Sequence, residues 1–133
     1  MRRAWGMVLV LGMLATGCAS LRNVCCPPAS QVGHVRHIVL FKFKDDAKPE
    51  QIQLVETRFC ELRKQIPLIR DFEWGTNMSP EKLDAGFTHC FFVTFANAND
   101  RDAYLPHPAH QAFVEILKPV LDKALVIDYV AKE

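Results

Sequence analysis

Apolar residues alternate with a period of two in four separate stretches, and each of these stretches is expected to form a β-strand. The first is Arg36–Lys44, and the strongest is Phe87–Phe95, in which His89 shares a face with large apolar residues. Shorter stretches cover Ile69–Trp74 and Leu125–Val130. The inward face of the first strand is expected to carry His37, Val39, Phe41 and Phe43.

The segment from Pro49 to Pro67 has the period of an amphipathic helix instead. Pro49 suits a first helical turn, and Pro67 ends the pattern. A polar connection follows over residues 75–86. The buried stripe of this helix is expected to comprise Ile52, Val55, Phe59, Leu62 and Ile66.

Two helical segments are expected between the third and the fourth strand. A short helix carries Tyr104, with Asn99 or Asp100 as its cap. The last helix begins at Pro108, and Pro119 is expected to kink or shorten it. Its inner stripe is expected to comprise His110, Phe113 or Val114, Leu117 and Leu121.

The order strand, helix, strand, strand, helix, strand is typical of a split βαβ arrangement, an α+β fold with a four-stranded antiparallel sheet. The helices of such a fold cover one face of the sheet. The other face is partly apolar in this chain, which predicts that it pairs with a second copy. The domain is expected to span residues 35–133.

The N-terminal region has the pattern of a bacterial lipoprotein signal peptide over residues 1–17. A basic start precedes an apolar run that is shorter than the roughly 20 residues of a membrane span. Small residues then lead to Cys18, which resembles the acylated cysteine of a lipobox, and residues 18–34 form a flexible tether. Ala19 carries no acidic retention signal, and by resemblance to Gram-negative lipoproteins this favours the outer membrane over the inner, with the domain facing the periplasm. The alternatives are a secreted protein cut near Ala19 and an internal start site.

The remaining cysteines have two interpretations. Cys25 and Cys26 are adjacent in the tether and too close for an unstrained mutual disulfide, so they either crosslink two tethers or are incidental thiols. Cys60 and Cys90 are interpreted as core thiols.

The composition suits a single globular domain and excludes one class of partner. The chain has 133 residues, 50% of them hydrophobic, and a formal net charge of +1. Because no run of like charges marks a polyanion-binding surface, no nucleic-acid partner is expected.

The candidate chemistry lies in three imidazoles and a phenol that are expected to converge on one apolar volume. Tyr104 and His110 flank the junction of the last two helices, and the strand pattern places His37 and His89 on inward faces. An imidazole, with an ordinary pKa of about 6.5, can act as a base, and a phenol can donate a proton. Together these groups predict a pocket for a small apolar or aromatic ligand.

Other uses of these residues remain open. His107 and His110 have a spacing of three residues, but no nearby carboxylate or cysteine completes a ligand set, so no metal site is expected. The same segment also suits a purely structural role: a turn, a rigid helix start and a hydrogen bond from His107 to the preceding loop. The residue types alone therefore leave catalysis, a non-catalytic pocket and structural use as alternatives.

Four segments in order resemble the stress-responsive alpha/beta-barrel family, Dabb. They are His37–Lys44, Phe72–Gly75, Gly86–His89 and Arg101–His110. The resemblance covers the chain from about Val35 to Tyr129. It implies a ferredoxin-like fold whose sheets pair face to face into a homodimeric barrel.

Within that family the chain is similar to plant polyketide cyclases of the olivetolic acid type, which perform an intramolecular aldol condensation. That similarity implies catalytic roles for Tyr104 and His110 and pocket roles for His37 and His89. It also identifies a difference, since Phe59 stands where the cyclases have a pocket tyrosine. Phe59 and His107 are also expected to lie at the pocket.

These observations lead to two hypotheses. The first is a membrane-anchored, homodimeric module that binds a small ligand or is associated with stress. The expected location favours this hypothesis, because the cyclases act on coenzyme A thioesters and these are cytoplasmic, so a periplasmic domain would not meet them. The alternative is a cofactor-free cyclase or lyase. A structural oligomer is a third class without specific support.

Overall fold

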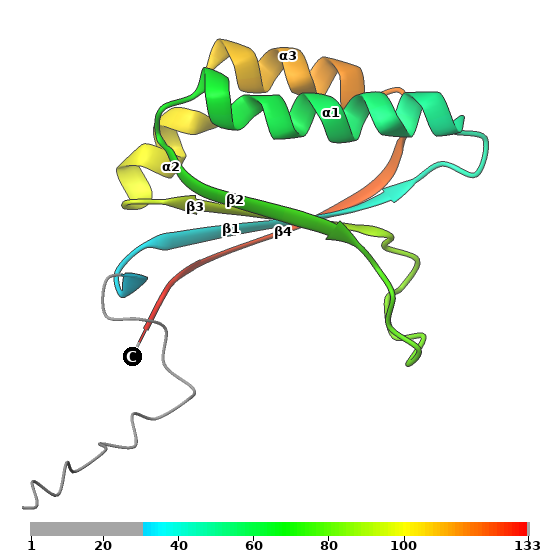
Figure 1. The fold of residues 1–133 in the computed structure, drawn as a ribbon, viewed down its shortest axis with the longest axis horizontal. Coiled ribbons are helices and arrows are strands. Elements are labelled where there is room, and N and C mark those ends of the chain that lie inside the picture. The colour runs from blue at the N-terminus through cyan, green and yellow to red at the C-terminus, as the bar shows by residue number, and fades with distance from the viewer. Residues whose placement is uncertain (1–30, 133) are drawn as a thin grey trace, which may run out of the picture.

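The computed structural model describes residues 31–132, which form a four-stranded antiparallel sheet with helices on one face (Figure 1). The strand order in the sheet is β2-β3-β1-β4, so the fold is the expected ferredoxin-like α+β arrangement. In chain order the elements are β1 (Val35–Phe43), α1 (Pro49–Gln65), β2 (Ile69–Thr76), β3 (His89–Phe95), α2 (Ala98–Tyr104), α3 (Pro108–Leu117) and β4 (Leu121–Val130).

The start of α2 differs from expectation, and of the two effects expected of Pro119 the structure shows the shortened helix. Asn97, rather than Asn99 or Asp100, caps α2, because its side-chain oxygen accepts a hydrogen bond from the Asp100 amide at 2.9 Å. Pro119 shortens α3 rather than kinking it, since a proline cannot continue the helical hydrogen bonds. Leu121 therefore belongs to β4 and not to the inner stripe of α3.

Aromatic side chains between the helices and the sheet form the centre of the core. The expected inward residues of β1 are buried, as are those of β3 from His89 onward. Phe59 of α1 lies 4.3 Å from Phe91 of β3 and 4.6 Å from Phe113 of α3, measured between ring centroids. The ring of Phe59 thus connects α1 both to the sheet and to α3 within the buried core.

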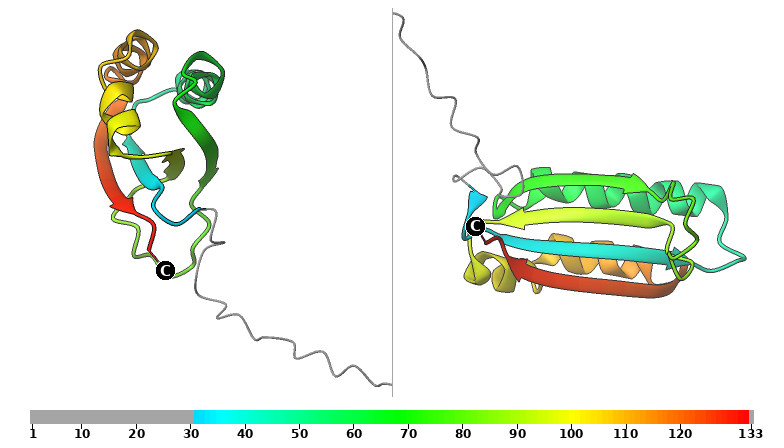
Figure 2. Two further views of the ribbon diagram at one scale, coloured as in Figure 1. Left: turned by 90° about the vertical axis from the view of Figure 1, so that its left-hand side faces the viewer. Right: turned by 90° about the horizontal axis from the view of Figure 1, so that it is seen from below.

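The opposite face of the sheet carries no helix in the described part of the chain (Figure 2, right). Leu125, Ile127 and Tyr129 of β4 lie on this open face, because they pair with the outward residues of β1. All three are 43–47% exposed. A row of large apolar side chains in water is characteristic of an interaction surface.

The chain immediately before β1 contacts the domain. The Gly33 amide donates a hydrogen bond to the Ala131 carbonyl at 2.9 Å, so the last residues of the expected tether lie beside the end of β4. The expected signal peptide, Cys18 and the Cys25–Cys26 pair lie outside the described residues. Within the described range, no helix is long and apolar enough to span a bilayer.

Candidate functional site

A cavity of about 260 Å³ lies between the sheet and the α2–α3 segment. Three of the sequence-predicted site residues, Tyr104, His110 and His37, line it, and Asp128 of β4 adds a carboxylate. Its remaining walls are mostly apolar: Val39, Phe41, Phe59, Leu105, Phe113, Val114, Leu117, Ala124 and Val126. An apolar hollow with a few polar groups is the usual form of a small-molecule site.

Tyr104 is the most deeply buried polar side chain of the cavity. It ends α2 and is 0% exposed, and its hydroxyl has no hydrogen-bond partner among residues 31–132. Burial strongly raises the pKa of the phenol, so the hydroxyl stays protonated at neutral pH. The site therefore contains a permanent hydrogen-bond donor that the described part of the protein does not itself use.

His110 packs against Tyr104, with 4.3 Å between the ring centroids. It lies in the first turn of α3, and its Nδ1 is 2.9 Å from the Leu105 carbonyl. A carbonyl only accepts hydrogen bonds, so Nδ1 carries the hydrogen and Nε2 of the neutral ring has a free lone pair. Burial lowers the pKa of His110, and the nearby His37 and His107 lower it further, which favours this neutral form.

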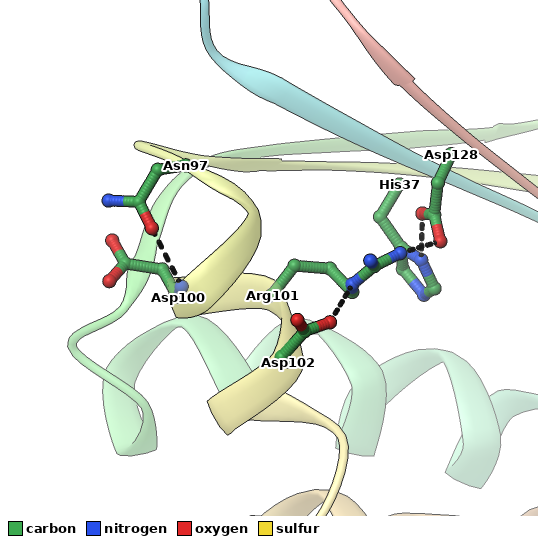
Figure 3. A network of polar contacts seen from close by, with 6 residues as sticks. All are labelled: His37, Asn97, Asp100, Arg101, Asp102 and Asp128. Carbon is green, nitrogen blue, oxygen red and sulfur yellow. Dashed lines mark hydrogen bonds and ion pairs between the residues drawn. The ribbon is translucent and has the colours of Figure 1, made fainter.

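His37 reaches the same cavity from β1. Its Nδ1 is 2.7 Å from Oδ1 of Asp128, and the other Asp128 oxygen accepts from the Arg101 guanidinium (Figure 3). The ring of His37 also meets Tyr104 edge-on, at 5.9 Å between centroids. His37, Tyr104 and His110 are therefore gathered at one place, as the sequence predicts.

His89 is not part of this group. His37 pairs with Val93 and Phe41 pairs with His89, so the two histidines are separated by roughly 13 Å along the sheet. The His89 ring instead lies between two polar partners, with Nε2 3.0 Å from Glu56 Oε1 of α1 and Nδ1 2.8 Å from the Thr88 hydroxyl. The expected convergence of three imidazoles is corrected to two, because register places the third at the far end.

His107 also stands apart from the cavity. It is the N-cap of α3, and its Nδ1 accepts a hydrogen bond from the Ala109 amide at 3.2 Å. The ring thus bonds forward into the helix, while the backbone amide of His107 donates a hydrogen bond back to the Tyr104 carbonyl at 3.0 Å. Phe59, in contrast, lines the cavity and presents an apolar ring there.

Sequence reasoning missed Asp128 and Arg101. The available signal was a charged residue within the apolar run Leu125–Val130, at a position that period-two alternation places on the same face as Val126. Arg101 had no comparable signal, since an arginine in a short exposed helix is unremarkable without knowledge of what lies opposite.

A larger hollow, of about 430 Å³, lies on the open face beside β2 and β3. Trp74, Cys90 and Phe92 contribute to its lining. Cys90 is exposed there, so the interpretation of Cys90 as a core thiol is wrong, while Cys60 is partly buried. The smaller cavity is the candidate site, because the buried unpaired Tyr104 hydroxyl, His37 and His110 lie there. No cluster of three or more histidine, cysteine or acidic side chains that could hold a metal ion occurs in the described chain.

The sequence matches a known family model over residues 35–131, that of the stress responsive A/B barrel domain, Dabb. The chain belongs to this family. A stress-response A/B barrel domain-containing protein of Arabidopsis thaliana, HS1, is 40% identical over 97 residues, covering 73% of this chain and 89% of that protein. Olivetolic acid cyclase of Cannabis sativa is 29% identical over 99 residues, covering 74% and 98%.

Solved structures of the family extend the range of functions. Hydroxynitrile lyase from Passiflora edulis has a TM-score of 0.71 and 28% identity, covering 75% of this chain and 94% of that one. A dimeric protein of unknown function with a ferredoxin-like fold, from Bacteroides fragilis, has a TM-score of 0.61 and 34% identity, covering 74% and 96%. The family thus includes cyclase and lyase enzymes as well as dimeric proteins of unknown function.

Proposed function

We propose that this protein is a homodimeric small-ligand-binding module whose cavity between the sheet and α3 holds a compact, neutral, largely apolar compound. The observation that carries the proposal is the Tyr104 hydroxyl, which is fully buried in a mostly apolar hollow without a partner among the described residues. An unpaired buried hydroxyl costs about 1–3 kcal/mol, and a ligand oxygen placed beside it offsets that cost.

The cavity also limits the size and charge of the ligand. At about 260 Å³ it is just below the range of roughly 300–1,000 Å³ typical of drug-sized pockets, which favours compounds with one ring or two fused rings. Asp128 contributes a carboxylate to the lining, which disfavours an anionic ligand.

Acetophenone and ethylbenzene provide a matched test, since they have similar shapes and only the ketone has an oxygen acceptor. We expect the wild-type protein to bind acetophenone more tightly, by roughly tenfold, and Tyr104→Phe to abolish that preference. Ethylbenzene binding, measured by calorimetry or by NMR shifts of the His110 ring, is the control and should change little. A preference that survives in Tyr104→Phe would exclude the hydroxyl as the donor, and no binding of either compound would exclude the pocket.

A second function, a cofactor-free cyclase or lyase, is supported by the geometry of Tyr104 and His110. A neutral His110 can take a proton from the carbon next to a ligand carbonyl through Nε2, and the resulting carbanion can attack a second carbonyl in the same molecule. Tyr104 would then give its proton to the new alkoxide and recover it from His110. Two relatives carry the names of enzymes of this general kind, a cyclase and a lyase.

Binding and catalysis are separated by one variant. His110→Gln keeps a side-chain amide that can donate to the Leu105 carbonyl but removes the base. If the protein is an enzyme, this variant should retain ligand binding and lose at least about a hundredfold in turnover of a diketone substrate. Deuterium exchange at the carbon next to the ketone of acetophenone provides a simpler readout. Equal exchange in wild type and variant would leave binding as the function.

The homodimer is proposed from the open face of the sheet. Leu125, Ile127 and Tyr129 expose a row of apolar side chains there, and a ferredoxin-like relative of similar size is described as dimeric. Two such faces packed together would remove these side chains from water.

Membrane anchoring is proposed separately, from the sequence around Cys18. Two or three acyl chains on this cysteine would hold the protein stably at a membrane surface. The expected result is that Cys18→Ser shifts the protein from the membrane fraction to the soluble fraction. Retention of the variant in the membrane fraction would contradict the lipoprotein assignment.

A further inference from the structure

A chain of polar contacts runs from α2 to the cavity wall and ends on His37. Arg101 Nε donates to Asp102 at 2.8 Å, and the Arg101 guanidinium also binds Oδ2 of Asp128. Oδ1 of Asp128 is 2.7 Å from His37 Nδ1 (Figure 3). The His37 side chain is 6% exposed, whereas Asp128 and Arg101 are 31% and 22% exposed, so the chain of contacts leads from the surface into the site.

The two oxygens of Asp128 have different partners, and this difference fixes the carboxylate in one orientation. One oxygen is held by a guanidinium from α2, which leaves the other to face β1. A carboxylate only accepts hydrogen bonds, so the neutral His37 ring must carry its hydrogen on Nδ1. Nε2 of the neutral ring then has a free lone pair.

We propose that Asp128 and Arg101 are positioning residues that hold His37 in the Nδ1–H tautomer, so that Nε2 accepts a hydrogen bond from the ligand. The inference rests on the ligand pocket proposed above and narrows the ligand class. Tyr104 requires an acceptor on the ligand, and His37 requires an N–H or O–H donor. The preferred ligand is therefore a neutral ring compound that carries both groups.

The tautomer can be measured without any ligand. Nitrogen-15 NMR distinguishes the two ring nitrogens of a neutral histidine, and we expect the wild-type His37 to show hydrogen on Nδ1. In Asp128→Asn the Arg101 guanidinium should retain the amide oxygen, which turns the amide NH2 toward His37 Nδ1. The amide then donates to that nitrogen, and the His37 hydrogen should move to Nε2.

The double variant Asp128→Asn, Arg101→Met tests the role of Arg101. Without the guanidinium the amide is free to turn its oxygen toward His37, so a substantial part of the Nδ1–H form should return. A purely structural role for Arg101 would not restore a tautomer. Identical spectra for the single and the double variant would therefore exclude Arg101 as a positioning residue.

Indole and benzothiophene test the consequence for binding, because they have nearly the same shape and only indole has an N–H donor. We expect wild type to prefer indole and Asp128→Asn to lose about tenfold of that preference, with benzothiophene binding unchanged. If Asp128→Asn keeps the full preference for indole, the indole N–H must donate to another acceptor, such as His110 Nε2. That result would overturn the proposed role of His37.

The outcomes separate this inference from the proposed function. If neither ring compound binds, the pocket proposal fails, while the tautomer measurements still test the Asp128–His37 pair. If Asp128→Asn does not fold, the wild-type spectrum is sufficient, since hydrogen on Nε2 of His37 would overturn the inference directly.

Discussion

At the scale of single residues, the site combines groups whose hydrogen-bonding roles are set by their surroundings. Burial keeps Tyr104 protonated, and the Leu105 carbonyl directs the free lone pair of His110 to Nε2. Asp128 does the same for His37. The site thus offers one hydrogen-bond donor, the Tyr104 hydroxyl, and two acceptors, Nε2 of His110 and Nε2 of His37. Each role is fixed by a single hydrogen-bond partner or, for Tyr104, by burial.

Tyr104→Phe should stabilise the empty protein. The substitution removes a buried hydroxyl without a partner among the described residues and keeps the ring contacts with His110 and Phe95. The free energy of unfolding, measured in urea, is expected to rise by about 1–3 kcal/mol. A loss of stability in Tyr104→Phe would show that the hydroxyl has a partner in solution.

His110 should make the protein less stable in acid. Burial lowers its pKa in the folded state, so the unfolded chain takes up the proton first as the pH falls. The contribution of neutral His110 to the free energy of unfolding is therefore complete above the unfolded pKa of about 6.5, and it declines as the pH drops below that value. Comparing wild type with His110→Gln between about pH 7.5 and pH 5 isolates this effect from other titrating groups. The variant should lose less stability than wild type, and parallel curves would contradict the prediction.

At the scale of elements, the position of Tyr104 depends on how the short helix α2 is held. α2 spans Ala98–Tyr104, and few intrahelical bonds stabilise a helix of this length by itself. Two contacts compensate for this, the Asn97 cap at its start and the tie from Arg101 to Asp128 of β4. The pocket therefore depends on polar contacts as well as on the aromatic core.

Asn97→Ala should weaken the start of α2. Loss of the cap leaves the Asp100 amide without its side-chain acceptor, and the expected cost is about 1 kcal/mol in the free energy of unfolding. Asn97→Asp is the matched control, because aspartate caps equally well. Hydrogen exchange of the α2 amides should accelerate in the alanine variant alone, and equal exchange in both variants would count against the cap.

At the scale of the whole molecule, the two faces of the sheet have different tasks. One face supports the helices and the cavity, while the other exposes apolar residues of β4 (Figure 2). The separation allows a protein of this fold to assemble through one face without closing the site on the other.

Ile127→Asp should convert the proposed dimer into a monomer. The substitution places a charge in the middle of the apolar row on β4, where pairing of two open faces would remove it from water at a cost of several kcal/mol. Leu54→Asp on α1 is a matched control, since Leu54 is 44% exposed and Ile127 is 47% exposed. Sedimentation velocity should show dissociation for Ile127→Asp only. A monomeric wild type, or a dimeric Ile127→Asp, would contradict the assembly.

The sequence by itself determined the elements, the fold class and most of the inward residues, because periods of two and of about 3.6 are local properties of the chain. It also placed Tyr104 and His110 correctly, since they are close in sequence and flank one helix junction. The tertiary structure decided the remaining questions. Strand register moved His89 to the far end of the sheet, and the pairing of β1 with β4 brought Asp128 to His37. The His37–Asp128 contact joins residues 91 positions apart in the chain, and no local pattern encodes a pairing over such a distance.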